Sequence, residues 1–355
     1  MKIYVATIIL TCLSMLVLAI FAMNNDAITK PTKRGFVLSA ALIAVSAAAE
    51  CGGEFLNGAS ADLRWLHSVI KFLELSAAPF IPVVLSSAFY PIKYRKIVFG
   101  LLLTNVLIEF LSIFFGITFF VDENNFYVHR TFYPVYYVAI ALGTAFLIVT
   151  ALKFLKYYQN YNLSTLIAIT VFASAGIITQ IIDSEIKIVW LTIAAGFTLF
   201  YIYYGSIILR TNALTGLLNR RSFESRIKSD KRRIGIAFFD VNDFKSINDT
   251  HGHGYGDHCL ETVGEAIKTI YGKAGRCYRV GGDEFCVIFK SNAFDIEELN
   301  AAFSEYLNDK RTTDRFLPTV AVGYAVFDPQ TDDMAQVLEN ADKQMYLAKN
   351  QFKNE

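Results

Sequence analysis

The chain has 355 residues, of which 54% are hydrophobic, and a formal net charge of +1 at pH 7. This length leaves room for two or three domains. A mean hydropathy of +0.38 is too high for a water-soluble protein of this size. The near-zero net charge argues against nucleic acid as a partner. The five cysteines show no pairing pattern, which predicts no disulfide and no structural zinc.

Seven apolar runs precede Arg210, and each has about the twenty residues that a membrane-spanning helix needs. The runs cover residues 3–23, 35–55, 65–89, 97–119, 132–152, 163–182 and 188–209. The second run is rich in Ala and Ser, and the third carries several ionisable side chains. This pattern predicts an N-terminal α-helical transmembrane bundle over residues 1–209 and a separate C-terminal domain over residues 210–355.

Basic residues follow every second run, whereas the other loops are mostly acidic. The basic positions are Lys30, Lys33, Arg34, Lys93, Arg95, Lys96, Lys153, Lys156 and Arg210. The positive-inside rule places these loops in the cytoplasm. We therefore expect a multi-pass membrane protein with its N-terminus outside and its C-terminal domain in the cytoplasm. A cleaved signal peptide is the alternative for the first run, but no clear small-x-small site follows it.

Ionisable residues also occur inside the apolar runs. His67, Lys71 and Glu74 share one face of the third run, and Glu109 lies in the middle of the fourth. Charged groups at membrane depth are costly and usually face a bundle interior or a wet cavity. Two interpretations stay open: a polar pocket for an extracytoplasmic or intramembrane ligand, and ion pairs between helices.

Residues 279–285 read Arg-Val-Gly-Gly-Asp-Glu-Phe and separate two β-prone runs. Two glycines between such runs predict a tight hairpin turn. Because neighbouring residues of an extended backbone point in opposite directions, Asp283 and Glu284 can take different roles. Taken alone, the segment is either an acidic hairpin on a solvated edge or a catalytic site.

The segment resembles the signature of the GGDEF family of diguanylate cyclases. Further motifs of that family match in order at residues 214–221 (LTGLLNRR), 239–249 (FDVNDFKSIND), 252–257 (GHGYGD) and 341–349 (ADKQMYLAK). The resemblance covers residues 212–353. It implies a ferredoxin-like α/β palm domain similar to nucleotide cyclases, facing the cytoplasm at a bacterial inner membrane. It also implies a homodimer through the GGDEF and membrane regions.

The implied reaction condenses two GTP molecules into cyclic di-GMP and two pyrophosphates. A 3′-hydroxyl attacks an α-phosphate, which calls for a divalent metal, Mg²⁺ or alternatively Mn²⁺. The resemblance assigns Asp240, Asp283 and the Val241 carbonyl as ligands of that metal. Glu284 matches a residue that assists deprotonation of the hydroxyl or binds the metal.

The resemblance also assigns contacts to the substrate. Asn248 and Asp257 match the readers of the guanine edge, because an amide and a carboxylate suit guanine and leave adenine unpaired. The implied phosphate contacts are Asp243, Phe244, Lys245, Lys349 and Lys353.

Five positions depart from the family pattern. Asn212 and Asn242 stand where members usually or often have Asp, and Lys353 stands where Arg is usual. Gly272 and Gly275 replace the Arg and Asp of the family's inhibitory motif. A catalytically degenerate effector that binds GTP or cyclic di-GMP, and a transporter-like protein, are the alternative functions. Because the three expected catalytic carboxylates are present, an active enzyme is favoured.

The apolar periodicity of the C-terminal part predicts an order βααββαβα with helices on one face of a mixed sheet. The expected helices cover residues 215–227, 244–249, 257–271, 296–307 and 334–349, and the expected strands cover 234–241, 274–280, 285–289 and 320–327. The seventh apolar run is expected to continue as a helix to residue 212.

Overall fold

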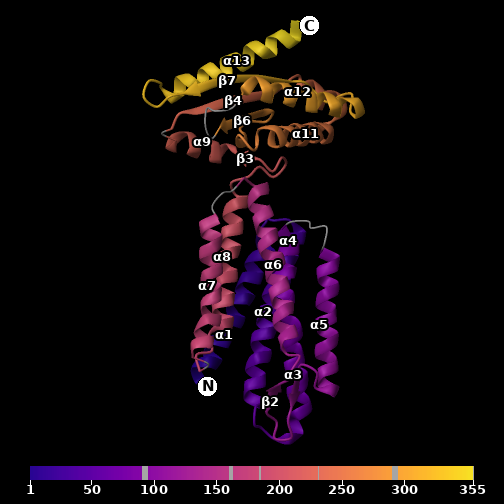
Figure 1. Ribbon diagram of the computed structural model, residues 1–355. Coiled ribbons are helices and arrows are strands. Elements are labelled where there is room, and N and C mark those ends of the chain that lie inside the picture. Colours follow the sequence, from indigo (N-terminus) through magenta and orange to yellow (C-terminus); the bar gives the residue numbers. More distant parts are fainter. Residues whose placement is uncertain (90–94, 160–162, 184, 231, 290–294, 355) are drawn as a thin grey trace. The chain divides into compact units, whose positions relative to one another are not determined.

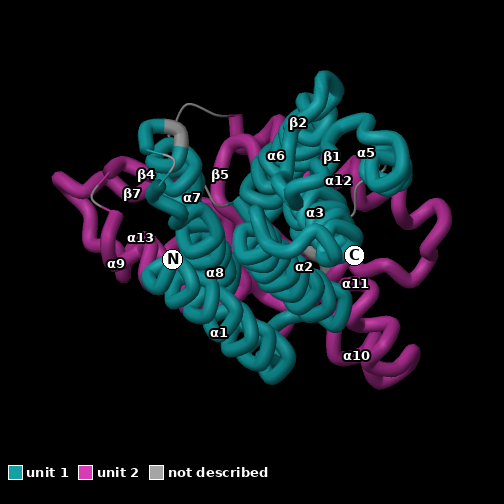
Figure 2. Tube along the Cα trace, turned by 90° about the horizontal axis from the view of Figure 1, so that it is seen from below, with its two compact units in different colours: residues 1–205 teal, residues 206–355 magenta. Residues whose placement is uncertain are grey.

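The computed structural model describes residues 1–89, 95–159, 163–183, 185–230, 232–289 and 295–354. Within helices, the side chains of residues 87–89, 95, 181 and 352–354 are not described. The chain divides into two compact units, Met1–Gly205 and Ser206–Glu355 (Figure 2).

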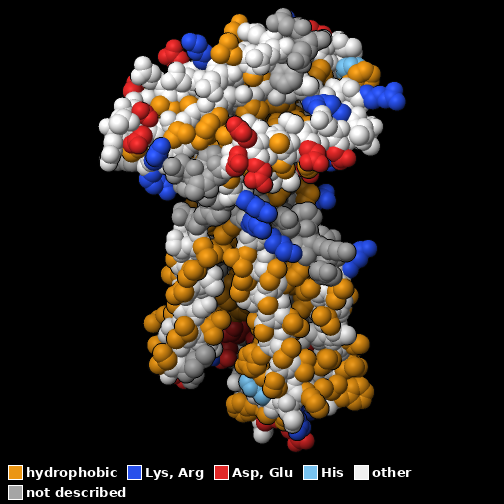
Figure 3. Space-filling view, turned by 45° about the horizontal axis from the view of Figure 1, so that its top comes forward, with side chains coloured by type: hydrophobic (Ala, Val, Ile, Leu, Met, Phe, Trp, Pro, Cys, Tyr) orange, Lys and Arg blue, Asp and Glu red, His pale blue; other side chains and the backbone are white. Residues whose placement is uncertain are grey.

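The first unit is helical. Its long helices are α1 (Lys2–Asn24), α2 (Lys30–Leu56), α3 (Arg64–Ala77), α4 (Phe80–Phe89), α5 (Arg95–Phe115), α6 (Pro134–Tyr157), α7 (Leu163–Ile182) and α8 (Val189–Ile208) (Figure 1). Counting Ala61–Ser86 as one span, seven helices of the described chain are long and apolar enough to cross a membrane. Hydrophobic side chains cover much of this unit's visible surface (Figure 3). Such a surface suits lipid better than water.

Two of the apolar runs differ from their predicted extent. The third is interrupted between Ala77 and Phe80, because Pro79 has no N–H to continue the helix. The fourth ends at Phe115, where Gly116 turns the backbone with a φ of +60°. The following residues form an antiparallel hairpin of β1 (Phe119–Val121) and β2 (Tyr127–His129), which the apolar pattern does not predict.

The connection to the second unit also corrects two predictions. Helix α8 ends at Ile208 rather than continuing to residue 212, and Thr211 then pairs with Leu218 in an isolated β-bridge. The expected helix from residue 215 starts later, because Gly216 has a φ of +66° and strand β3 (Leu218–Asn219) intervenes. Helix α9 (Arg220–Ser229) begins where the Asn219 side chain accepts a hydrogen bond from the Ser222 N–H at 3.0 Å.

The second unit is an α/β palm domain with a five-stranded sheet in the order β3-β5-β6-β4-β7. Strand β4 (Ile234–Val241) is antiparallel to both β6 (Glu284–Phe289) and β7 (Val320–Phe327), and β5 (Gly275–Arg279) is antiparallel to β6. The helices are α9, α10 (Phe244–His251), α11 (His253–Tyr271), α12 (Ile296–Thr313) and α13 (Met334–Asn354). The predicted order of elements after residue 233 is confirmed.

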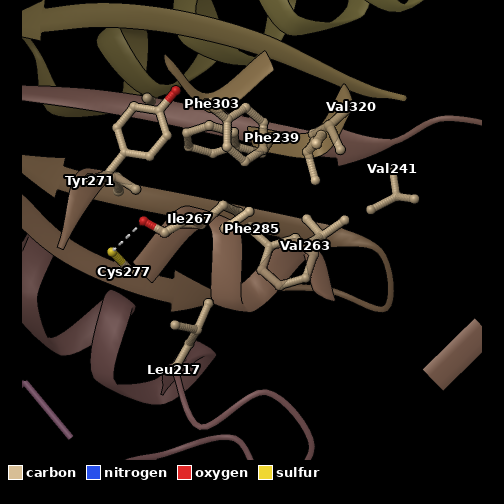
Figure 4. Packing of buried hydrophobic residues seen from close by; sticks show 14 of the residues in the cluster. Leu217, Phe239, Val241, Val263, Ile267, Tyr271, Cys277, Phe285, Phe303 and Val320 are labelled. Atoms are coloured by element: carbon tan, nitrogen blue, oxygen red, sulfur yellow. Dashed lines mark hydrogen bonds between the residues drawn. The ribbon is translucent and has the colours of Figure 1, made fainter. Parts of the chain in front are cut away.

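Helices cover both faces of this sheet, so the prediction of helices on one face is wrong. On one face, Phe239 of β4 packs in a cluster with Val263 of α11 and Phe303 of α12 (Figure 4). On the other, Ile236 of β4 clusters with Phe223 of α9 and Val337 of α13. Nearly every side chain of β4 is buried, and a strand that is apolar on both sides needs cover on both.

Candidate active site

Three acidic residues meet at the end of the central strands. Asp240 of β4 lies directly opposite Glu284 of β6 in the antiparallel register. The backbone N–H of Val241 donates to the carbonyl oxygen of Asp283 at 3.2 Å. The pairing of β4 with β6 therefore brings together Asp240, Val241, Asp283 and Glu284, the four positions assigned to metal and catalysis.

Gly281 in the turn before these acids leaves room for the Glu284 side chain. A Cβ atom on Gly281 would lie 2.4 Å from Glu284 Oε2, whereas one on Gly282 would meet nothing within 4 Å. The first glycine of the signature is thus needed for space. Any larger residue at position 281 would displace the Glu284 carboxylate.

The site is electrostatically crowded. Burial raises the pKa of Asp240, and the charges of Asp283 and Asp342 act in the same direction, while Lys349 opposes the increase. Burial also raises the pKa of Glu284, with Asp283, Asp240 and Asp342 adding to the increase. Lys349 Nζ lies 2.5 Å from Asp240 Oδ1. Burial lowers the pKa of Lys349, but the bond to Asp240 outweighs this effect and the net pKa is raised.

Asp342 belongs to this group although the sequence motifs do not assign it a role. Asp342 lies on α13, the helix that also carries Lys349. The charge of Asp342 acts on both Asp240 and Glu284. Its position inside the ADKQMYLAK motif is the only signal for it in the sequence. The end of the sheet therefore carries four nearby carboxylates, and among the described residues the Lys349 ammonium group is bonded to one of them, Asp240.

The donor set fits a hard divalent cation. Mg²⁺ is usually held by one or two carboxylates together with substrate phosphates. Asp240 in β4 and Asp283 in the turn directly before β6 supply two carboxylates. Their mutual repulsion would be relieved by a cation of charge two. Within the described ranges, no three His, Cys, Asp or Glu side chains gather closely enough to hold a metal by themselves. Substrate oxygens would complete the coordination.

The two assigned guanine readers lie close together. Asn248 of α10 lies over Gly256, because a Cβ on Gly256 would be 2.0 Å from Asn248 Oδ1. Asp257 is the next residue and is exposed. Asn248 therefore lies next to the residue that precedes Asp257, and the missing side chain of Gly256 is what allows this approach.

The assigned phosphate contacts surround the start of α10. Asp243 caps this helix in the left-handed conformation, with φ of 52°, and makes no side-chain capping bond. The first N–H groups of Phe244 and Lys245 are free of helical partners and can bind an anion. Lys245 is exposed, and the charge of Asp243 acts on Lys349. Lys353 lies in α13, but its side chain is outside the described part of the chain.

Arg279 is a further residue at this site that the motif assignments omit. Its guanidinium donates to the Gly282 carbonyl at 3.2 and 2.7 Å and to Asn212 Oδ1 at 3.2 Å. Asp257 and Asp283 both act on its charge. Arg279 thus connects the turn at residues 281–283 with the segment that leads into the domain. Asn212 accepts the hydrogen bond from Arg279 with a neutral amide oxygen, where the family usually has a carboxylate.

Asn242 has a structural role. Its side-chain NH₂ donates to Thr319 Oγ1 at 2.8 Å, and its backbone N–H donates to the Thr319 carbonyl at 2.9 Å. These bonds attach the loop after β4 to the residue that directly precedes β7. Only the side-chain bond depends on the amide, because a carboxylate at this position would have to accept from the Thr319 hydroxyl instead.

Comparisons with known proteins agree on the second unit. A sequence model of the family described as "Diguanylate cyclase, GGDEF domain" matches residues 210–355. Diguanylate cyclase DgcP of Escherichia coli is 34% identical over 186 residues, which are 49% of this chain and 52% of DgcP. Diguanylate cyclase DgcS of Shewanella oneidensis is 30% identical over 150 residues, 40% of this chain and 50% of DgcS. The chain thus spans about half the length of these relatives.

Among solved structures, the chain is similar to the GGDEF domain of DgcB from Caulobacter crescentus in complex with c-di-GMP. The identity is 28% and the TM-score 0.34, and the match covers 40% of this chain and 90% of that one.

Proposed function

We propose that residues 210–355, which form a GGDEF domain, are a diguanylate cyclase that condenses two GTP into cyclic di-GMP and two pyrophosphates. The observation that carries the proposal is the β4–β6 pairing, which sets Asp240 opposite Glu284 with Asp283 beside them. Degenerate members that only bind the nucleotide typically lose one of these carboxylates. Here all three are present, at the end of β4, at the start of β6 and in the turn directly before β6.

In this proposal, different residues bind the guanine base, the phosphates and the reacting 3′-hydroxyl of GTP. Asn248 and Asp257 would read the guanine, since together they offer both donor and acceptors. The start of α10, with Asp243, Phe244 and Lys245, would hold phosphate oxygens, together with Lys349 and Lys353. Asp240, Asp283 and the Val241 carbonyl would hold Mg²⁺, or Mn²⁺ in its place, which neutralises charge as pyrophosphate leaves. Glu284 would take the 3′-hydroxyl proton or share the metal.

Two further features belong to the proposal. One such site holds one GTP, and the product needs two, so two domains must face each other in a homodimer. The seven apolar helices would anchor the protein in a bacterial inner membrane with the N-terminus outside, and would control the cyclase. A helix that leaves the membrane can transmit a shift to the domain that follows it.

The direct test incubates the purified full chain with GTP and Mg²⁺ and measures cyclic di-GMP. We expect turnover in the wild type and its loss in Asp283→Asn, which keeps the shape of the side chain and removes its charge. Asp309→Asn, an exposed acid on α12, is the matched control and should keep full activity. A folded wild-type protein that binds GTP but forms no product would instead be the nucleotide-binding effector.

The topology has its own test. A reporter fused after Arg34 or Lys156 should report the cytoplasm, and one fused near Asn57 or Asn124 should report the outside. The opposite result at Arg34 alone would favour the cleaved signal peptide.

A further inference from the structure

The helical unit contains buried hydrogen-bond acceptors for which the described chain provides no donor. His67 of α3 and Glu109 of α5 are 0% exposed and Asn105 of α5 is 3% exposed. Among the described residues, His67 Nε2, Asn105 Oδ1 and Glu109 Oε1 have no hydrogen-bond partner. An unpaired buried polar atom is costly, and most such atoms in proteins have a partner. A hydrogen-bond donor from outside the described chain would satisfy all three atoms.

The protonation of His67 follows from its neighbour Asn125. The Asn125 NH₂ donates to the carbonyls of Leu56 and Ser60 at 2.9 and 3.1 Å, so its Oδ1 must be the acceptor. His67 Nδ1 lies 3.0 Å from that oxygen and therefore carries the proton. In the neutral ring, Nε2 is then an acceptor that points away from Asn125. The charges of Lys71 and Glu54 act on His67, so a polar neighbourhood surrounds the ring.

Asn105 and Glu109 have one polar group satisfied and one left over. The Asn105 NH₂ donates to the Leu75 carbonyl at 3.3 Å, the carbonyl that Pro79 cannot bond because it lacks an N–H. Glu109 Oε2 accepts from Thr118 Oγ1 at 2.6 Å. The two residues are four positions apart and so share one face of α5. Their two unpaired atoms, Asn105 Oδ1 and Glu109 Oε1, are both oxygens.

Tyr127 of β2 lies between the surroundings of the histidine and those of the glutamate. Its ring centroid lies 6.4 Å from that of His67 and 5.9 Å from that of Phe119, which directly follows the Thr118 bonded to Glu109. The same ring already receives an ammonium group of the chain, since Lys71 Nζ lies 4.6 Å from its centroid and 2.9 Å from Glu74 Oε2. A carboxylate and an aromatic face are the usual surroundings of a bound organic cation. Lys71 and Glu74 neutralise each other, which leaves Glu109 with no described cation.

We propose that α3, α5 and the β1–β2 hairpin form a binding site for a small organic ammonium ion, with Glu109, His67 and Tyr127 as its contacts. An ammonium group donates up to three hydrogen bonds and carries the positive charge that an ionised Glu109 would need as its partner. A neutral alcohol would supply one donor and no charge. A bare metal ion is disfavoured, because the described side chains offer no cluster of three ligating groups.

The test uses the purified full chain in lipid nanodiscs and three probes of similar size: n-butylammonium, 1-butanol and butyrate. The readout is the midpoint of thermal unfolding as the probe concentration rises. Because a ligand that binds only the folded state stabilises it, we expect a saturable increase with butylammonium and none with the other two. This binding measurement needs neither GTP nor product, so its outcome is independent of whether the GGDEF domain is active.

Variants decide which residues are responsible. Glu109→Gln removes the charge and should weaken butylammonium binding by roughly tenfold or more. His67→Phe keeps a ring of similar size and should weaken it in the same direction, which provides a second reading where one variant fails to fold. Glu123→Gln changes an exposed acid of the same hairpin and should bind as the wild type does. Equal responses to all three probes, or wild-type affinity in the Glu109 and His67 variants, would overturn the proposal.

Discussion

Lys349 balances the charge of Asp240, and the pH dependence of kcat/KM tests this role. The ammonium lowers the pKa of Asp240 against the effect of burial, so Lys349→Ala should let that pKa rise further. Asp240 must be ionised to hold a cation, and activity is lost as the pH falls through its pKa. The acid limb of the kcat/KM profile should therefore move to higher pH in the variant.

The control for this change is Lys343→Ala, which removes an exposed lysine from the same helix. It should leave the profile in place. If Lys349 served only as a phosphate contact, its removal would lower the rate at every pH and leave the position of the acid limb unchanged.

Gly256 and Gly254 form a matched pair for the guanine site. A Cβ on Gly256 would lie 2.0 Å from Asn248 Oδ1, whereas one on Gly254 would meet nothing within 4 Å. Gly256→Ala should therefore push Asn248 aside and raise KM for GTP by roughly tenfold or more, because a buried polar contact to the base is lost. Gly254→Ala should leave KM unchanged, as steady-state kinetics on both proteins would show. Equal KM values would mean that Asn248 does not read the base.

At the level of elements, β5 explains why product inhibition should be weak. Gly275 starts this strand, and a Cβ there would lie 2.6 Å from Val287 Cγ1 and 2.8 Å from the Ile288 carbonyl. The pairing with β6 therefore leaves no space for the family's inhibitory Asp, and Gly272 offers no side chain in place of the Arg. Each missing charge-assisted contact is worth about 1.5–3 kcal/mol.

Progress curves with added cyclic di-GMP provide the measurement. We expect little change in rate at low micromolar product. Half-inhibition in that range would mean that other cations near β5, such as Lys273 or Arg276, have taken over recognition of the product.

The elements that could be predicted from sequence are those with a strong apolar pattern. Strand β4 and the helices of the second unit after residue 243 were recognisable because their burial is continuous or periodic. The strands β1, β2 and β3 have only two or three residues each, too few for any periodicity. The sequence gives no sign of the end of α8 at Ile208, because the turn that follows contains neither Gly nor Pro.

The candidate site shows the same division. Motif spacing placed Asp240, Asp283 and Glu284, because strand pairing brings the ends of neighbouring strands together. Spacing says nothing of Arg279 or Asp342, since their roles depend on how the hairpin and α13 pack in three dimensions. In the helical unit, the sequence points to His67 and Glu109 as polar residues at membrane depth. It does not show which of their atoms lack a partner, because an unpaired atom is a property of packing and not of composition.

At the scale of the whole molecule, one GTP-binding site per domain predicts that activity per molecule depends on protein concentration. In the proposed reaction one domain supplies one GTP and two domains must meet for each product, so an isolated fragment of residues 206–355 should be limited by its own association. Its activity per molecule should rise steeply, in near proportion to protein concentration, while the domains are mostly monomeric. In the full chain, a membrane unit that pairs two copies would raise the effective concentration of the domains and flatten this dependence.

Cyclic di-GMP formation over a hundredfold range of fragment concentration, with the mass in solution followed in parallel, measures this directly. Mixing in excess Asp283→Asn fragment should lower the rate, because wild-type domains are then captured in pairs that hold only one complete site. Activity per molecule that stays constant in a fragment shown to be monomeric would mean that a single domain completes the reaction. The need for two copies, and with it the role given to the membrane helices in bringing them together, would then be wrong.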